Sequence, residues 1–495
     1  MTSERRVPVH APMDGFQYCE GELQVGGLPL SRLAAQAGQT PFYAYDRRLL
    51  AARVAELRQC LPPEVKLHYA MKANPMPALV GHMARLVDGI DVASGGELRV
   101  ALDAGADPRE ISFAGPGKSV GELRQAVASG ILINVESFRE VGLLSEIAQQ
   151  TGWRARVAVR VNPDFELKGS GMKMGGGAKQ FGVDTEEVPR LLESIGRQGL
   201  DFEGFHLFAG SQNLRAESIC EAQCKAYELA VRLAGHASAP VRFVNLGGGF
   251  GIPYFPGETR LDTAPIGANL AALVSRAAND LPGAALVIEL GRYLVGEAGI
   301  YVCRVIDRKV SRGQVFLVTD GGLHHHLSAS GNFGQVIRKN YPVAIGTKGP
   351  ETAREIASVV GPLCTPLDTL ADRMDLAVAE PGDLVVVFQS GAYGASASPQ
   401  RFLSHPAGAP RQLLDDLAQR AGVAGEPVRH RISDLLAGLE APATVFAERG
   451  TWVDGDARAR VEGEWLTTNV SGPDLLVALC WWASRQNARS VQVRH

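Results

Sequence analysis

The sequence predicts an α/β fold in which a parallel (β/α)8 barrel of the TIM type is joined to a mostly β domain. Two observations indicate the barrel. From Lys66 onward, short apolar runs alternate with amphipathic helical stretches, and eight such units fit into roughly 230 residues. Glycine and polar side chains follow nearly every run, as they do at the active ends of barrel strands. The expected strands are Lys66–Met71, Gly89–Ala93, Ile111–Ala114, Ile131–Val135, Ala155–Val161, Asp201–Phe208, Arg242–Leu246 and Ala285–Leu290.

Helical patterns lie between these strands and show the apolar period of an α-helix. They are Met76–Leu86, Glu97–Ala104, Val120–Ser129, Phe138–Gln149, Glu186–Ile195, Glu217–Ala234 and Ala264–Ala277. After Arg292 the helical period fades and β-branched runs follow, which predicts the second domain. We expect the barrel at residues 42–290 and a β-sandwich or β-barrel domain formed by residues 1–41 and 291–410. Residues 411–495 are expected to be an appended C-terminal extension of unknown role, with four of the five tryptophans.

Composition excludes several classes of protein. The chain has 495 residues with a net charge of −3, so it lacks the basic footprint of a nucleic-acid-binding protein. No apolar run reaches the roughly 18 residues that a membrane span needs, and the N-terminus lacks the apolar core of a signal peptide. Seven scattered cysteines are typical of free thiols in a reducing compartment. We therefore expect a cytoplasmic protein without nucleic-acid partners.

The strand ends carry the residues that suggest chemistry. They are Lys72; Asp91 with Ser94; Gly115; Glu136 with Ser137; Arg160 with Asn162; His206, Phe208 and Ser211; Gly247–Gly248–Gly249; and Glu289 with Arg292. Burial lowers the pKa of an ammonium, and a neutral amine can form a Schiff base with an aldehyde. A lysine that simply emerges into solvent is the plain alternative for Lys72.

Several of these residues together match the needs of an aldehyde cofactor that has a phosphate and a pyridine ring. Lys72 supplies the amine, and the glycines at 247–249 let backbone N–H groups approach a phosphate. Glu289 could keep a ring nitrogen protonated, which makes the ring an electron sink. Tight-turn glycines and a buried Glu289–Arg292 ion pair remain the structural alternatives.

Six motifs in fixed order then carry a resemblance. They are Tyr69-Ala-Met-Lys-Ala-Asn74, Gly204-Phe-His-Leu-Phe-Ala-Gly-Ser-Gln212, Gly247-Gly-Gly-Phe-Gly251, Glu289-Leu-Gly-Arg292, Gly361-Pro-Leu-Cys364 and Gly391-Ala-Tyr393. Over residues 10–406 the chain resembles the fold-type III, alanine racemase-like pyridoxal-phosphate decarboxylases, the group of diaminopimelate and ornithine decarboxylases. The glycine-rich stretch Lys168–Gly182, with Phe208 and Phe402–Pro406, is similar to the subgroup associated with exosortase systems and carrier-bound amino acids.

The resemblance implies a role for each matching residue. Lys72 would form the internal aldimine of pyridoxal 5′-phosphate, and Glu289 would bind its pyridine nitrogen. Cys364 would protonate the substrate carbon after carbon dioxide leaves, and it would reach the site from the partner subunit of a homodimer with shared active sites. The cofactor phosphate would be held by Gly247, Gly248, Gly249, Ser211, Arg292 and Tyr393.

The sequence departs from the family pattern at two informative positions. Phe208 stands where the family has a histidine stacked on the cofactor ring. Thr365 stands after Cys364, where diamino-acid decarboxylases carry an acid that recognises the distal amine, and a threonine cannot neutralise a buried ammonium. The resemblance therefore implies a lyase that releases carbon dioxide from an α-amino acid or from an aminoacyl group on an acyl carrier protein.

Other interpretations stay open. Diaminopimelate or another diamino acid is the alternative substrate, and a racemase or a non-catalytic pyridoxal-phosphate-binding protein is the alternative activity. The triplet His324–His326 suggests a metal at first sight, but adjacent histidines cannot all face one ion, so no metal site is expected.

Overall fold

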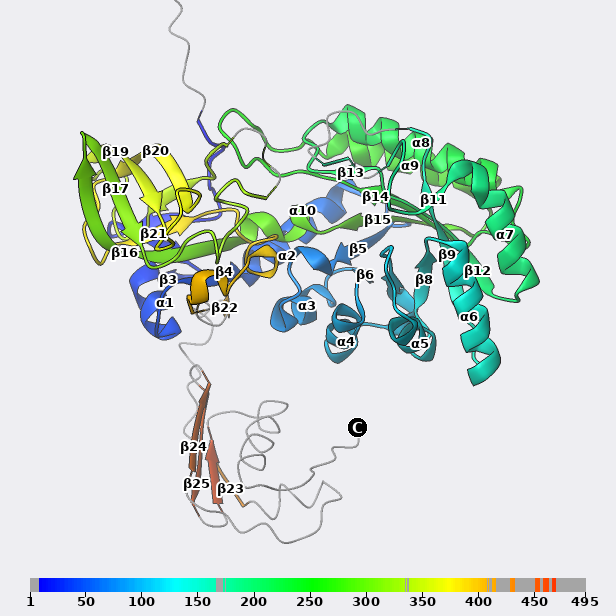
Figure 1. The fold of residues 1–495 in the computed structure, drawn as a ribbon, viewed down its shortest axis with the longest axis horizontal. Helices are drawn as coiled ribbons and strands as arrows, with labels where there is room; N and C mark the ends of the chain where they lie inside the picture. The colour runs from blue at the N-terminus through cyan, green and yellow to red at the C-terminus, as the bar shows by residue number, and fades with distance from the viewer. Residues whose placement is uncertain are drawn as a thin grey trace, which may run out of the picture. The chain divides into compact units, whose positions relative to one another are not determined.

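The computed structural model describes residues 9–165, 172–173, 175–333, 335, 338–406 and 408, and the backbone of strands between residues 412 and 468. The chain divides into two compact units, Met1–Asp415 and Asp416–His495. Figure 1 labels the elements of both. None of the described helices combines the length and the hydropathy that crossing a membrane requires.

The first unit contains the predicted barrel, which is confirmed. Eight parallel strands pair in the order β9-β12-β14-β15-β5-β6-β7-β8, and β8 pairs with β9 to close the ring. Their bounds are β5 (Lys66–Ala70), β6 (Gly89–Val92), β7 (Ile111–Phe113), β8 (Leu132–Val135), β9 (Arg156–Asn162), β12 (Asp201–Leu207), β14 (Phe243–Gly248) and β15 (Ala285–Leu290). A short strand, β11 (Val183–Asp184), adds to the outer side of β9.

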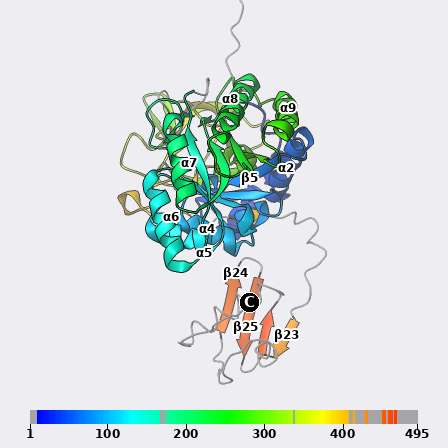
Figure 2. The same cartoon turned by 90° about the vertical axis from the view of Figure 1, so that its right-hand side faces the viewer.

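Helices cover the outside of this ring, as Figure 2 shows. They are α2 (Arg47–Cys60), α3 (Pro77–Met83), α4 (Gly95–Asp103), α5 (Val120–Ala128), α6 (Phe138–Thr151), α7 (Val188–Arg197), α8 (Ala216–Ala234) and α9 (Ala264–Asp280). Three of them begin with the pattern Ser-x-x-Glu, in which the serine oxygen accepts a hydrogen bond from the backbone N–H of the glutamate. Ser94 and Ser137, two of the expected strand-end site residues, are used as these helix caps.

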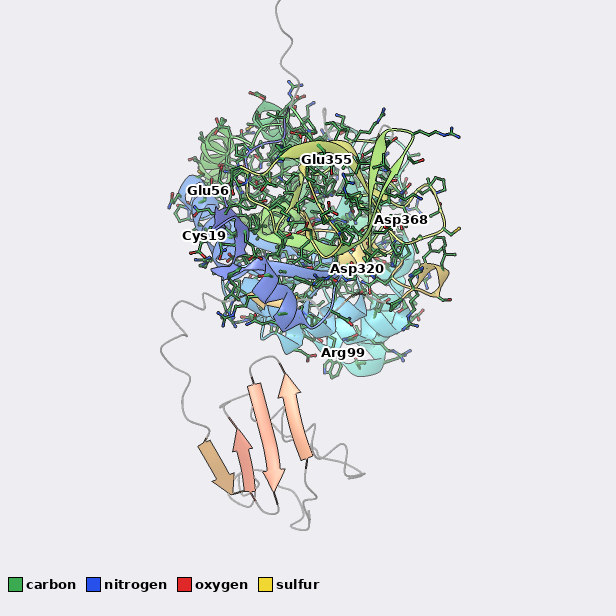
Figure 3. The ribbon with its side chains drawn as sticks, turned by 90° about the vertical axis from the view of Figure 1, so that its left-hand side faces the viewer. Cys19, Glu56, Arg99, Asp320, Glu355 and Asp368 are labelled. Carbon is green, nitrogen blue, oxygen red and sulfur yellow. The ribbon has the colours of Figure 1, made fainter. Side chains whose placement is uncertain are left out.

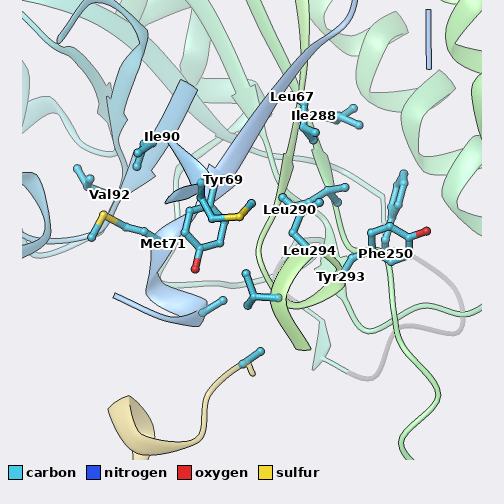
Figure 4. Packing of buried hydrophobic residues seen from close by; sticks show 14 of the residues in the cluster. Leu67, Tyr69, Met71, Ile90, Val92, Phe250, Ile288, Leu290, Tyr293 and Leu294 are labelled. Carbon is cyan, nitrogen blue, oxygen red and sulfur yellow. The ribbon is translucent and has the colours of Figure 1, made fainter. Parts of the chain in front are cut away.

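Alternation along the barrel strands separates apolar from polar side chains. Leu67 and Tyr69 of β5 and Ile288 and Leu290 of β15 belong to the apolar cluster that Figure 4 shows. The residues between them, His68 and Glu289, lie on the opposite face of their strands, toward the barrel interior. Both are buried. The interior of this barrel therefore carries charged and titratable groups, which are costly to bury without partners.

The β domain extends beyond its expected boundary. It contains β16 (Gly299–Ser311), β17 (Gln314–Thr319), β18 (Val343–Ile345), β19 (Arg354–Val360), β20 (Thr369–Ala377) and β21 (Leu384–Val387). Strand β4 (Phe42–Asp46), which the boundary at residue 42 assigned to the barrel, pairs antiparallel with β16 instead. β22 (Gln412–Leu414) pairs with β4, so the first unit continues past residue 411. Local patterns could not reveal either pairing, because the partners lie far apart in the sequence.

The N-terminal segment packs on this sheet. It forms β1 (Gln17–Cys19), β2 (Glu22–Val25), β3 (Leu28–Pro29) and α1 (Leu30–Ala37). Its buried side chains, Leu23, Leu30 and Leu33 among them, join Phe42 and Ile300 in a second apolar cluster. The second unit contains an antiparallel sheet in the order β23-β26-β25-β24. Its strands are β23 (Val428–Arg431), β24 (Gly450–Asp454), β25 (Ala457–Glu462) and β26 (Trp465–Thr468).

Candidate active site

Lys72 lies where β5 ends, in the short 3₁₀ turn Met71–Ala73. Two motif neighbours fix this turn. The Tyr69 hydroxyl donates to the Asn74 carbonyl at 2.9 Å, and the Asn74 amide donates to the Gly391 carbonyl at 2.9 Å. The half-buried Lys72 ammonium lies 5.4 Å from the centre of the Phe208 ring. The two expected site residues from β5 and from the end of β12 therefore face each other.

Glu289 lies near the end of β15 and is 6 % exposed. Its Oε2 atom is 2.8 Å from Nε2 of His206 and accepts a hydrogen bond from the Asn245 amide at 3.0 Å. Burial alone would raise the pKa of this carboxyl. The positive charges of His206, Lys72 and Arg160, with the His206 hydrogen bond, outweigh burial and lower the pKa to about 2. Glu289 is thus held ionised, within electrostatic reach of Lys72.

The glycine run after β14 adopts a conformation that needs glycine. Gly247 and Gly249 have positive φ angles of 73° and 78°, which side chains with a Cβ atom rarely adopt. At Gly248 a Cβ atom would overlap the Glu289 carbonyl oxygen. Two hydrogen bonds hold this turn. The Asn245 side chain accepts the Gly247 N–H at 2.7 Å, and the Asn213 N–H donates to the Gly249 carbonyl at 2.9 Å.

Arg292 and Tyr393, two of the expected phosphate-binding residues, lie in contact with each other. The Arg292 guanidinium carbon lies 4.7 Å from the centre of the Tyr393 ring, and an Arg292 N–H donates to the Tyr254 hydroxyl at 2.9 Å. The buried Nε of Arg292 has no hydrogen-bond partner among the described residues. Ser211 belongs to the short strand β13 (Gly210–Ser211), which pairs with β10 (Met172–Lys173).

Two other strand-end residues serve the structure instead. Glu136 and Arg160 form a buried ion pair at 2.9 Å. The Glu136 carboxylate also accepts the backbone N–H groups of Gly115, at 2.6 Å, and Gly182, at 3.0 Å. Because both oxygens of Glu136 are already hydrogen-bonded, this residue has a structural role: it links the loops that follow three barrel strands.

Cys364 lies in a loop between β19 and β20 and is exposed. Asp368, labelled in Figure 3, fixes this loop: its carboxylate accepts the N–H of Leu323 at 2.6 Å and of Leu363 at 2.8 Å. A Cβ atom at Gly361 would overlap that carboxylate. Within the described parts of the chain, no hydrogen bond or ion pair joins Cys364 to Lys72 or Glu289.

Two members of the histidine triplet, His325 and His326, are hydrogen-bonded within the protein. Nε2 of His326 lies 2.8 Å from the Ser390 hydroxyl, and Nε2 of His325 lies 3.1 Å from the Pro406 carbonyl oxygen. Burial lowers the pKa of His326 to about 3, so the ring is neutral. These two rings act as hydrogen-bonded members of the core.

Comparison with known proteins identifies the family. The model of the pyridoxal-dependent decarboxylase pyridoxal-binding domain matches residues 47–296. The chain is 38 % identical, over 412 residues, to the L-glutamyl-[BtrI acyl-carrier protein] decarboxylase of Niallia circulans, covering 80 % of this chain and 96 % of that protein. This chain belongs to the pyridoxal-dependent decarboxylases. It is also 34 % identical to the diaminopimelate decarboxylase of Aquifex aeolicus, over 77 % of this chain and 89 % of that protein.

Solved structures agree with this assignment. The crystal structure of Helicobacter pylori diaminopimelate decarboxylase, determined with L-lysine, covers 78 % of this chain and 94 % of its own. Its TM-score is 0.69 and its sequence identity to this decarboxylase is 29 %. The similarity spans the barrel and the β domain, so the fold, the lyase class and the cofactor, pyridoxal 5′-phosphate, follow together.

The groups at the barrel end of this decarboxylase fit that cofactor. A primary amine, an ionised carboxylate and an aromatic face converge there, as Lys72, Glu289 and Phe208. The unpartnered Nε of Arg292 is a donor suited to a phosphate, and the glycine turn has no side chains that would block close approach to its backbone. When bound, pyridoxal 5′-phosphate supplies a ring that withdraws electrons from the α carbon of the substrate.

Two contributors were missed by the motif analysis. His206 is among the strand-end residues named from the sequence but has no role assigned to it there, and Asn245 is not among them. Both lie opposite each other in the register of β12 and β14, and both bond Glu289. The signal that could have found them is strand alternation, because every second residue of a barrel strand points into the barrel.

Proposed function

We propose that this decarboxylase removes carbon dioxide from an α-amino acid, most specifically from an aminoacyl group held on an acyl carrier protein. Lys72 holds the cofactor aldehyde, and Glu289 contacts the pyridine nitrogen. Phe208 packs on the ring in place of a histidine. The phosphate is bound by Ser211, Gly247–Gly249, Arg292 and Tyr393. Cys364 delivers a proton to the substrate carbon.

The substrate proposal rests on the side chains that the Cys364 loop offers to a substrate. Thr365 follows the cysteine, and the loop's single carboxylate, Asp368, is 2 % exposed and already accepts two backbone N–H groups. The loop therefore offers no free acid to a distal ammonium, and an unpaired buried ammonium is costly. The relative from Niallia circulans acts on a carrier-bound glutamyl group, which has no such ammonium.

The test is a comparison of substrates. Carbon dioxide release is measured for free α-amino acids, for diaminopimelate, lysine and ornithine, and for aminoacyl groups loaded on carrier proteins. We expect the highest kcat/KM on a carrier-bound aminoacyl group. Efficient turnover of diaminopimelate would instead assign the alternative function, which the 34 % identical relative from Aquifex aeolicus represents.

Replacing Thr365 with aspartate tests the loop argument directly. The new carboxylate could pair with a distal ammonium, so kcat/KM on diamino acids should rise by about tenfold, the worth of one charge-assisted hydrogen bond. Thr365→Asn is the matched control, since asparagine has the shape of aspartate without its charge. Equal gains in both variants would contradict a role for charge at this position.

We also propose a cytoplasmic homodimer in which Cys364 enters the partner's site. The exposure of Cys364, and its separation from the hydrogen-bond network of Glu289, support this arrangement. Lys72→Ala and Cys364→Ser dimers would each be inactive. After random subunit exchange, half of the dimers are mixed and each has one intact site, so about a quarter of wild-type activity should return.

The mixing experiment has an internal control. Two differently tagged Lys72→Ala subunits are exchanged under the same conditions, and co-purification of the tags reports that exchange took place. This pair should stay inactive. Verified exchange between the Lys72→Ala and Cys364→Ser subunits without recovered activity would argue that each subunit builds its own site.

A further inference from the structure

A cavity lies at the other end of the barrel, among the residues where the strands begin. Its volume is about 180 Å³. Its charged lining residues are Lys66, Arg109, Glu110, Arg156, Glu203 and Arg242. Lys66 and Ala285 are the first residues of β5 and β15, whereas Lys72 and Glu289 lie near the opposite ends of those strands. We call this cavity the floor pocket.

The floor pocket carries an excess of positive charge. Four of its lining residues are lysine or arginine and two are glutamate, a balance of +2 that falls to +1 with Asp107, which pairs with Arg109 at 2.7 Å. The two glutamates are already paired, Glu110 with Lys66 at 2.6 Å and Glu203 with Arg156 at 3.3 Å. Arg242 is exposed and forms no ion pair with any residue that the structure describes. Among the residues that the structure describes, the pocket thus presents one cation without an ion-pair partner, Arg242, and both of its carboxylates are paired.

His68 forms the inner wall of the pocket and is 2 % exposed. Its Nδ1 atom is 3.0 Å from Oδ1 of Asp91, which also accepts the Ser112 hydroxyl at 2.6 Å. Its Nε2 atom has no partner among the described residues. Asp91 pairs in register with Ala70, farther along β5, so Nδ1 points toward the active-site end. Nε2, across the ring, faces the end where the floor pocket lies.

The electrostatic setting favours the ring form in which Nε2 carries a proton. Burial would lower the pKa of His68, but the charge and hydrogen bond of Asp91 outweigh burial, and the pKa is raised. A protonated ring has an N–H at both nitrogens. A buried N–H without an acceptor is costly, so Nε2 calls for an acceptor from outside the described residues.

We propose that the floor pocket binds a small oxyanion, with His68 Nε2 as the inner donor and Arg242 as a rim cation. The ligand chemistry is that of inorganic phosphate or a short organic carboxylate. An oxyanion would accept the orphaned N–H and neutralise the excess charge, and the volume leaves space for its remaining waters. The site lies outside the machinery assigned to the cofactor.

The test uses the full-length protein loaded with pyridoxal 5′-phosphate, so that the phosphate-binding groups at the active-site end are already filled. Inorganic phosphate is titrated at constant ionic strength, and binding is measured by calorimetry. We expect saturable binding of one phosphate per chain. Wild-type protein that binds no phosphate in this assay would overturn the proposal.

Substitutions of lining residues test whether the phosphate binds in the floor pocket. Arg242→Gln should weaken phosphate binding about two- to fivefold, as expected for an exposed charge, and His68→Gln about tenfold, because a charge-assisted donor is lost. Should His68→Gln fail to fold, the double variant Arg109→Gln/Arg242→Gln supplies the second measurement. Arg99→Gln is the matched control: Arg99, labelled in Figure 3, is exposed on α4 and is not among the lining residues. Equal weakening by the control would place the phosphate elsewhere and overturn the proposal.

A competition experiment separates the two ligand sources. Succinate is added to the phosphate-loaded protein at matched ionic strength. Displacement of phosphate that depends on His68 assigns the pocket to organic carboxylates, whereas retention assigns it to phosphate. Both results support an oxyanion site.

Discussion

Lys72→Ala protein is expected to be colourless after reconstitution with pyridoxal 5′-phosphate and to lose decarboxylation by roughly 10⁴-fold or more, because the amine that acts covalently is gone. Lys72 sits in a turn held by Tyr69 and Asn74, so its removal should leave the surrounding backbone in place. The measurements are the visible absorbance spectrum and carbon dioxide release. Circular dichroism checks that the fold is retained.

The control for Lys72 is a lysine on an outer helix of the barrel. Lys225, on α8, is partly exposed and forms an i,i+4 ion pair with Glu221 at 2.7 Å. Lys225→Ala should keep the absorbance and the activity, since an exposed helical pair contributes only about 0.3–0.5 kcal/mol. Visible absorbance and turnover that persist in Lys72→Ala would remove the chemical role assigned to this residue.

Glu289→Gln is expected to lower kcat by about 10²–10³-fold while leaving substrate KM little changed, since a fixed charge that acts on the reacting ring is lost. Glutamine keeps the shape of glutamate and can still accept the hydrogen bond from the Asn245 amide. It has no negative charge, so it loses the electrostatic interaction with His206 and Lys72. The folded-state pKa of about 2 lies below the ordinary value of 4.5. Ionised Glu289 therefore adds stability above about pH 4.5 that is lost toward pH 2, and this pH dependence should disappear in the variant.

Glu136→Gln is the matched control for this change. Glu136 is also a buried carboxylate at a strand end, but it bonds Arg160 and two loop N–H groups. Its loss should lower the free energy of unfolding by about 3 kcal/mol, because Arg160 loses a buried partner. Denaturant unfolding and kcat measured on both variants separate the two roles. A stability loss without a kcat effect in Glu289→Gln would reduce Glu289 to a structural residue.

The barrel was predictable because its signal is local and repeated. β15 occupies the predicted range Ala285–Leu290, and β5 was expected to end only one residue later than it does. Lys72 and Glu289 were also predictable, since strand ends of a closed barrel converge whatever the loops do. The residues around Glu289 were harder, because His206 and Asn245 become its partners only through the lateral register of three strands.

Some strand-end residues that the sequence suggested for the active site have structural roles instead. Ser94 and Ser137 cap helices. Each is followed three residues later by a glutamate, a pattern that predicts a helix cap. The start of the barrel was placed too early, at residue 42, since a short strand's partner is not encoded in its own pattern. Phe42–Asp46 has the composition of a barrel strand, yet it pairs with residues near 300.

The pairing of β4 with β16 also sets an order of events during synthesis. β4 leaves the ribosome before any barrel strand, whereas its partner follows the last of them. The barrel can close once residue 290 has emerged, because all of its strands are then available. Until β16 is made, β4 has an unpaired edge on a nascent chain that already contains every barrel strand. We therefore expect the β domain to acquire its native structure after the barrel, and the interval before β16 emerges to be the one in which a chaperone helps most.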